Sequence, residues 1–107
     1  MDDRVCYSVN HEGIVTWISP NVFDMFGWEA HEVIGRNFVD FVPSEDMNEV
    51  VKNRTNRVPG ITQEYKMGIL RKDGKREMVY CRVLQTPENT IGSLDRRLTS
   101  RPIIRKE

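Results

Sequence analysis

The sequence predicts an α+β domain in which short helices cover one face of an antiparallel sheet. Near the N-terminus, two segments rich in β-branched and aromatic residues flank a turn at residues 10–13. Glycine and proline then divide residues 19–43 into pieces that allow only short helices. After Gly60, apolar residues recur at every second position around an Asp73-Gly74 hairpin signal. This layout suits a sensing pocket better than a catalytic cleft.

Length and composition bound the possibilities. The chain has 107 residues, of which 38% are hydrophobic and 30% charged. We expect one domain over residues 1–107, whose core buries roughly 60–68% of the unfolded surface. No apolar run approaches the ~18 residues of a membrane span, and no signal segment leads the chain. We therefore expect a cytoplasmic location without membrane contact by this domain.

Charge is balanced overall but unevenly distributed. Basic and acidic residues number 16 each, so the chain lacks the basic excess of a nucleic-acid-binding domain. Residues 1–60 contain 5 Lys or Arg and 10 Asp or Glu, whereas residues 61–107 contain 11 and 6. The two halves are either separately solvated, or complementary to each other or to a partner.

The first elements follow from local signals. Strands are predicted over residues 5–9 and 14–18. Ser19 is a good N-cap, and Pro20 suits the first position of a short helix because its missing N–H is not needed there. Gly27 ends this helix.

Two more helices are predicted before the C-terminal strands. One spans residues 29–34 and ends at Gly35. The next begins at Ser44 as N-cap, with acidic residues in its first turn, and fades toward Pro59. One face of this helix is expected to carry Met47, Val50, Val51 and Arg54.

The C-terminal half predicts three strands. Tyr65, Met67 and Ile69 share one face of the first, before the hairpin. In the second, Val79, Cys81 and Val83 alternate with Met78, Tyr80, Arg82 and Leu84, so that both faces are partly apolar. A final strand is expected from near Ile91 to Leu98 or beyond, ended by Pro102, with residues 101–107 starting a connector.

Cysteine and histidine placement argues against catalysis. Cys6 and Cys81 lie in separate predicted strands, which favours reduced core thiols over a disulfide. His11 is expected in a turn and His31 on a solvent-facing helix without a second metal ligand at helical spacing. The sequence shows no P-loop, dinucleotide fingerprint or converging pair of carboxylates. We therefore expect neither a metal site nor an enzyme.

The order of these landmarks resembles that of PAS domains along nearly the whole chain. Each piece alone is weak, but six pieces in order with sensible gaps are hard to obtain by accident. They are Val9-Asn10-His11-Glu12-Gly13-Ile14-Val15, Ser19-Pro20-Asn21, Met25-Phe26-Gly27-Trp28, Val33-Ile34-Gly35-Arg36-Asn37, Val42-Pro43-Ser44-Glu45-Asp46 and Arg71-Lys72-Asp73-Gly74-Lys75.

The resemblance implies a five-stranded antiparallel sheet with short helices packed on one face. It also implies a sensory or dimerising module of a larger signalling protein, here expected to be a sensor histidine kinase of a two-component system. Some PAS domains bind haem, flavin or small metabolites between the helices and the sheet, and many have no known ligand.

Departures from the family pattern narrow the choice of cofactor. Light-sensing LOV members have a reactive cysteine directly after Gly-Arg-Asn, where this chain has Phe38, and Ile69 and Val79 stand where flavin-binding polar groups are wanted. Residues 44–58 lack the histidine of haem-binding members. Flavin-adduct and histidine-ligated haem chemistry are therefore disfavoured, and the cofactor stays unknown. The family's C-terminal Asp-Ile-Thr signature is not reproduced in residues 99–104.

Two functional readings remain. In the first, a small ligand occupies a cavity lined by Ile34, Phe38, Met47, Val51, Tyr65, Met67, Val79, Cys81 and Val83, although the same pattern would also fill a ligand-free core. In the second, the domain serves protein–protein interaction, forming a homodimer through the outer sheet face or the N-terminal segment, with Met78, Tyr80 and Leu84 in the contact. Either reading implies an effector domain in the same protein as a partner.

Overall fold

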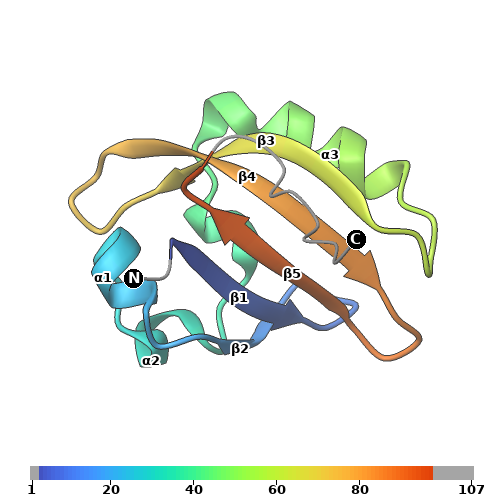
Figure 1. The fold of residues 1–107 in the computed structure, drawn as a ribbon, viewed down its shortest axis with the longest axis horizontal. Coiled ribbons are helices and arrows are strands. Elements are labelled where there is room, and N and C mark those ends of the chain that lie inside the picture. Colours follow the sequence, from blue (N-terminus) through green and yellow to red (C-terminus); the bar gives the residue numbers. More distant parts are fainter. Residues whose placement is uncertain (1–2, 98–107) are drawn as a thin grey trace, which may run out of the picture.

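The computed structural model describes residues 3–97, which form a five-stranded antiparallel sheet and several short helices (Figure 1). The strands are β1 (Arg4–Val9), β2 (Val15–Ile18), β3 (Gln63–Leu70), β4 (Arg76–Gln85) and β5 (Thr90–Asp95). The helices are α1 (Val22–Phe26), α2 (Ala30–Val33) and α3 (Met47–Thr55), with 3-10 turns η1 (Phe38–Phe41) and η2 (Ser44–Asp46). The predicted fold class is confirmed.

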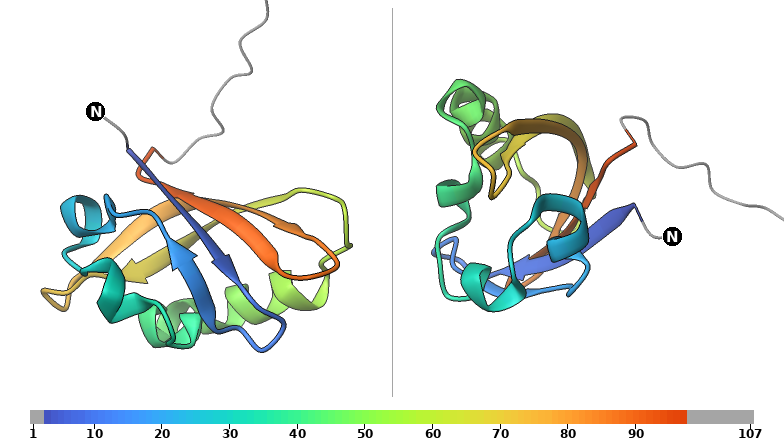
Figure 2. Two further views of the ribbon diagram at one scale, coloured as in Figure 1. Left: turned by 90° about the horizontal axis from the view of Figure 1, so that it is seen from below. Right: turned by 90° about the vertical axis from the view of Figure 1, so that its left-hand side faces the viewer.

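Strand order explains why the helices lie over the sheet. The order is β2-β1-β5-β4-β3, so β2 and β3 are the two edges. The helical segment that connects them must therefore cross from one edge to the other. Figure 2 shows the sheet curving around this segment, which covers its concave side. No helix within residues 3–97 has the length and apolar character needed to cross a membrane.

The two sheet faces follow the predicted alternation in β3 and β4. Met67 and Ile69 are buried on the concave face, as are Val79, Cys81 and Val83. The cysteine prediction is half wrong. Both thiols are free, but Cys6 is exposed because it alternates with buried Val5 in β1 and therefore points to the convex outer face.

The first helix begins later than predicted. Asn21, not Ser19, is the N-cap residue of α1, and its side chain does not cap the helix. The reason is that both polar side chains bind β1 instead. Ser19 Oγ accepts a hydrogen bond from the Cys6 backbone N–H at 3.0 Å, and Asn21 Nδ2 donates to the Arg4 carbonyl at 2.7 Å. These bonds attach the start of α1 to the sheet.

The second helix is capped at its N-terminus by two glutamates. Glu29 is the N-cap residue of α2, and its side chain accepts from the backbone of Glu32. The Glu32 carboxylate in turn accepts from the Glu29 N–H at 2.9 Å, which completes a capping box. His31 is exposed on this helix, as predicted.

The start of α3 is determined by a tertiary contact. Ser44 lies in η2 and does not cap α3; Asp46 occupies the N-cap position. The Asp46 carboxylate accepts two hydrogen bonds from Arg76, each 2.8 Å long, and is 6% exposed. A Cβ at Gly68 would lie 2.2 Å from this carboxylate, so only glycine leaves room for the pair.

Ion pairs join the acidic and basic halves of the chain. Besides Arg76–Asp46, Lys72 binds Glu32 of α2 and lies 5.1 Å from the centre of the Trp28 ring. The uneven charge distribution is therefore used in part within the domain, as the complementary reading predicted.

The last strand is shorter than predicted. β5 ends at Asp95, whose carboxylate accepts the Arg97 N–H at 2.9 Å and so turns the chain out of the strand. Leu98, Pro102 and the predicted connector at 101–107 lie outside the described residues, as do the positions compared with the Asp-Ile-Thr signature.

We expect Asp46→Asn to lower the free energy of unfolding by about 2 kcal/mol near neutral pH, because Arg76 loses its charged acceptor. Hydrogen bonding to Arg76 holds the pKa of Asp46 below its usual range. The stabilisation is thus present above the ordinary carboxyl pKa of about 4 and is lost as the pH falls through the lowered value. Urea denaturation across this pH range should show that the variant loses less free energy of unfolding on acidification than the wild type.

The control is Asp40→Asn, since Asp40 forms an exposed pair with Arg36 at 3.4 Å. Its expected effect is below about 0.5 kcal/mol. Equal effects of the two substitutions would contradict the role given to Asp46.

Candidate functional site

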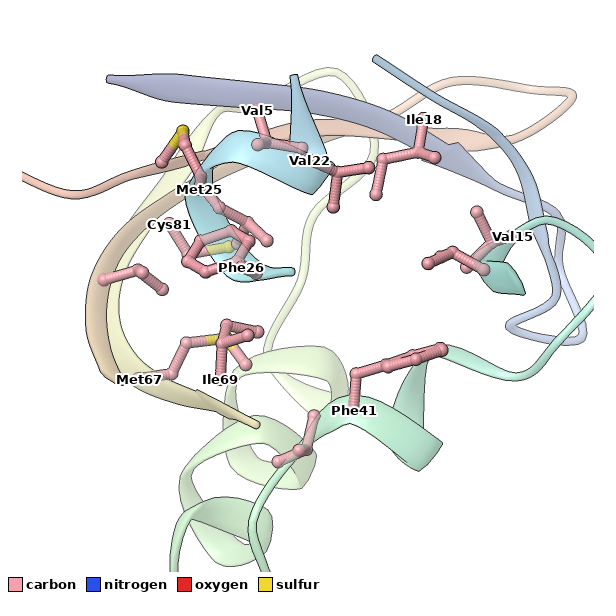
Figure 3. Packing of buried hydrophobic residues seen from close by; sticks show 14 of the residues in the cluster. Val5, Val15, Ile18, Val22, Met25, Phe26, Phe41, Met67, Ile69 and Cys81 are labelled. Carbon is pink, nitrogen blue, oxygen red and sulfur yellow. The ribbon is translucent and has the colours of Figure 1, made fainter. Parts of the chain in front are cut away.

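A cavity of about 80 Å³ lies between the concave sheet face and the helices. Every strand contributes to its wall, together with α1, α2 and η1. In Figure 3, Val15, Phe26 and Ile69 lie around this common space. Its lining residues are Tyr7, Val9, Val15, Ile18, Val22, Phe26, Trp28, Val33, Phe38, Phe41, Val42, Arg57, Tyr65, Met67, Ile69, Val83, Thr90 and Leu94.

Aromatic side chains on the helical side are held in place by specific contacts. Trp28 Nε1 donates a hydrogen bond to the Leu70 carbonyl of β3 at 2.9 Å. The Trp28 and Phe41 rings meet edge to face, with centroids 5.1 Å apart. These contacts couple the segment between α1 and α2 to both η1 and the sheet, so the helical wall of the cavity is fixed from two sides.

Three polar residues of the cavity wall, Tyr7, Tyr65 and Arg57, lie near Cys81, which is buried beside the wall. Tyr7 Oη lies 3.6 Å from Cys81 Sγ, and Tyr65 is the cross-strand neighbour of Cys81. Burial raises the pKa of Tyr7, Tyr65 and Cys81, so all three stay protonated near neutral pH. Arg57 lies beside this cluster, where its charge acts on all three groups.

A glycine in β5 gives Tyr7 its position. Gly92 pairs with Tyr7 on one side and with Val83 on the other. A Cβ at Gly92 would lie 2.7 Å from both Cζ and Oη of Tyr7. The phenol therefore lies across β5 where a side chain is missing, and so reaches Cys81 on β4.

The structure brings together part of the predicted cavity set. Phe38, Tyr65, Met67 and Val83 lie on the cavity wall. Val79 and Cys81 are buried in the core beside it, and Met47 is partly buried against that core. Whether any of these residues binds a ligand stays a prediction.

Two residues predicted to line the cavity are exposed instead. Ile34 is 41% exposed because α2 ends at Val33 and Ile34 has extended backbone angles, which turn its side chain outward. Val51 is 56% exposed because α3 lies along the β3 edge, and its neighbour Val50 takes the buried side of the helix.

Sequence reasoning missed several wall residues. Val9, Val15 and Leu94 carried an alternation signal that could have assigned them to the concave face. Arg57 gave no such signal, because it follows α3 in a segment without periodicity. Its side chain is placed by the hydrogen bond from Nε to Gln63 Oε1 at 3.2 Å.

The outer sheet face has a separate, shallow depression. Its lining includes Trp17, Leu84 and Ile91, together with Cys6 and Arg82. Trp17 is 49% exposed. The predicted outer residues Met78, Tyr80 and Leu84 are half-buried, and Tyr80 donates a hydrogen bond to Glu64. Within residues 3–97, no group of three or more His, Cys, Asp or Glu side chains could hold a metal ion.

A family model described as the PAS fold matches residues 3–93. The chain belongs to the PAS family. It is 31% identical over 58 residues to the Period circadian protein of Drosophila pseudoobscura pseudoobscura; that match covers 54% of this chain and 5% of the fly protein. The PAS domain thus spans only a small fraction of that curated relative.

Solved structures share the fold at low identity. The PAS domain of an HTR-like protein from Haloarcula marismortui has a TM-score of 0.72 at 16% identity, over 85% of this chain and 78% of that one. The PAS domain of the Cronobacter turicensis RpfR quorum-sensing receptor, in complex with BDSF, has 0.68 at 19%, over 89% and 94%. The N-terminal domain of a Marinobacter aquaeolei diguanylate cyclase with PAS/PAC sensor has 0.71 at 18%, over 85% and 92%.

We expect Gly92→Ala to destabilise the domain by about 1–3 kcal/mol, because the new methyl group overlaps the Tyr7 ring. The loss should shrink when Tyr7 is also replaced by Leu, since the two positions are in contact. Urea denaturation of the single and double variants gives this coupling.

Ser93→Ala is the matched control on the outer face, with an expected change within about 0.5 kcal/mol. Strict additivity of the Gly92 and Tyr7 substitutions would show that the ring does not depend on the missing Cβ.

Proposed function

We propose that this PAS domain is the sensory module of a larger cytoplasmic signalling protein and detects a small ligand in the cavity between helices and sheet. The proposal rests on the cavity itself. Its walls are largely apolar, and a few of its polar groups lie near Cys81. That combination is typical of small-molecule sites, where apolar walls bind and a few polar groups orient the ligand.

The comparisons support this reading by analogy. The RpfR receptor domain has a similar fold and was solved in complex with BDSF, and another similar domain belongs to a diguanylate cyclase with a PAS/PAC sensor. For the parent of this chain we propose a sensor histidine kinase, on the family resemblance of the sequence. The kinase activity would then reside outside these residues.

A chain of contacts supports relay from the cavity to the end of β5. Val22 and Phe26 of α1 line the cavity, and the Met25 carbonyl between them accepts hydrogen bonds from Arg71 and Arg96. Glu77 also binds both arginines. Because Arg96 directly follows β5, a ligand that prefers one position of α1 would shift the population of arrangements at the strand end.

Native mass spectrometry and an absorbance spectrum of the purified domain test ligand binding. We expect a retained mass that is lost on denaturation. Met67→Ala should lower affinity for the retained molecule at least tenfold, because Met67 forms part of the wall. Met78→Ala is the control, since Met78 is half-buried elsewhere in the sheet and does not line the cavity. If the Met67 variant unfolds and no effect on a ligand can be detected, Met67 and the other wall residues serve only as hydrophobic core.

Association is a second candidate function, favoured by the depression around Trp17 and Ile91 on the outer face. Its occupant would be a second copy of this domain. An exposed tryptophan over an apolar depression is typical of a binding surface.

Light scattering over a range of concentrations should show a dimer that Trp17→Ser weakens at least tenfold. Phe23→Ser is the matched control, because Phe23 is equally exposed but lies on α1. A wild-type domain that stays monomeric throughout would remove this second function.

A further inference from the structure

One charged side chain lines the otherwise uncharged cavity. Among the described residues of the wall, Arg57 is the only one with an ionised side chain at neutral pH. It is half-buried; its Nε donates a hydrogen bond to Gln63 Oε1 at 3.2 Å, and its side chain also interacts with the Tyr65 hydroxyl. Arginine has five N–H donors, so most of the donor capacity of Arg57 is not used by Gln63.

Arg57 combines partial burial with the lack of a counter-charge among residues 3–97, whereas Arg54 and Arg97, which also form no ion pair there, are exposed. Within residues 3–97 no carboxylate forms an ion pair with it. Five other arginines do hold carboxylates of the chain: Arg36, Arg71, Arg76, Arg82 and Arg96. A partly buried guanidinium without an anion is unfavourable, and a ligand carboxylate would supply the missing partner in bidentate geometry.

The groups around Arg57 would accept an anion rather than repel it. Tyr7 and Tyr65 are neutral and carry hydroxyl protons that can be donated. Cys81 is a protonated thiol because burial raises its pKa. No negative charge of the described chain therefore competes with an anion at this end of the cavity.

The apolar part of the cavity wall limits the size and polarity of the rest of the ligand. Phe26, Phe41 and Ile69 offer only apolar surface. The volume of about 80 Å³ corresponds to roughly five to eight water-sized groups. A large ring system does not fit this volume, whereas a short alkyl chain does.

We propose that the cavity binds a small amphipathic carboxylate, with its anionic head against Arg57 and the tyrosine hydroxyls and its alkyl chain among the apolar side chains of α1, η1 and β3. This inference rests on the proposed sensory function and specifies its ligand class.

Isothermal titration of the purified domain with hexanoate, hexanamide and hexylamine tests the head group. The three probes share an alkyl chain and differ in charge. We expect hexanoate to bind at least tenfold more tightly than hexanamide, and hexylamine to show no binding. This comparison uses the wild-type domain only, so it does not depend on how a variant folds.

Two arginine variants test the position of the head. Arg57→Gln should weaken hexanoate binding at least tenfold and leave hexanamide binding unchanged, with folding checked by circular dichroism. Arg54→Gln is the matched control, because Arg54 is exposed, lies over the Phe38 ring and does not line the cavity. It should leave binding of both probes unchanged.

The outcomes separate this inference from the sensory function. The proposal of an anionic head group is overturned if hexanoate and hexanamide bind equally, or if the Arg57→Gln variant binds hexanoate normally. In either case the cavity remains a binding site. Failure of all three probes also overturns the inference. The sensory proposal itself fails only if native mass spectrometry of the domain finds no retained molecule and no ligand effect of Met67→Ala.

Discussion

The Asp46–Arg76 pair over Gly68 is the contact on which the arrangement of this domain depends. It joins three segments: the junction of η2 and α3, the start of β4, and the middle of β3. The helices have only 4 to 9 residues, too few to be stable alone in water. Tertiary contacts must hold them, and this pair anchors the helical segment at the β3 edge while Ser19 and Asn21 anchor it at β1. The cavity lies between the concave sheet face and the helical segment that these contacts hold.

Glycine has the same role at two points on the sheet, one on each face. Gly68 admits the Asp46 carboxylate, and Gly92 admits the Tyr7 ring. In each case a strand residue without a side chain lets a polar group from another segment approach the sheet closely. One glycine thereby serves the attachment of the helices and the other serves the polar end of the cavity. The attachment of the helices and the polar end of the cavity thus depend on glycines on opposite faces of the sheet.

The success of sequence reasoning varies with the range of the interaction involved. Alternation assigned Met67, Ile69 and Val83 to the buried face, because a strand places every second side chain on one side whatever its neighbours are. Helix positions were less predictable. Val50 and Val51 have similar apolar character, and only the docking of α3 at the β3 edge decides that Val50 is buried. Ile34 failed for a related reason, since a four-residue helix ends before periodicity can place its last side chain.

By itself the sequence determined the α+β class, the turns and the alternation of β3 and β4, because these depend on neighbouring residues and on the limited backbone freedom of each residue type. The family followed from the order of short motifs. Only the tertiary structure decided which side chains meet: Tyr7 and Cys81 are 74 positions apart, and Asp46 and Arg76 are 30 apart. No local pattern specifies such contacts, since they form when the whole chain packs. For the same reason Arg57, in an irregular segment, became part of the cavity wall.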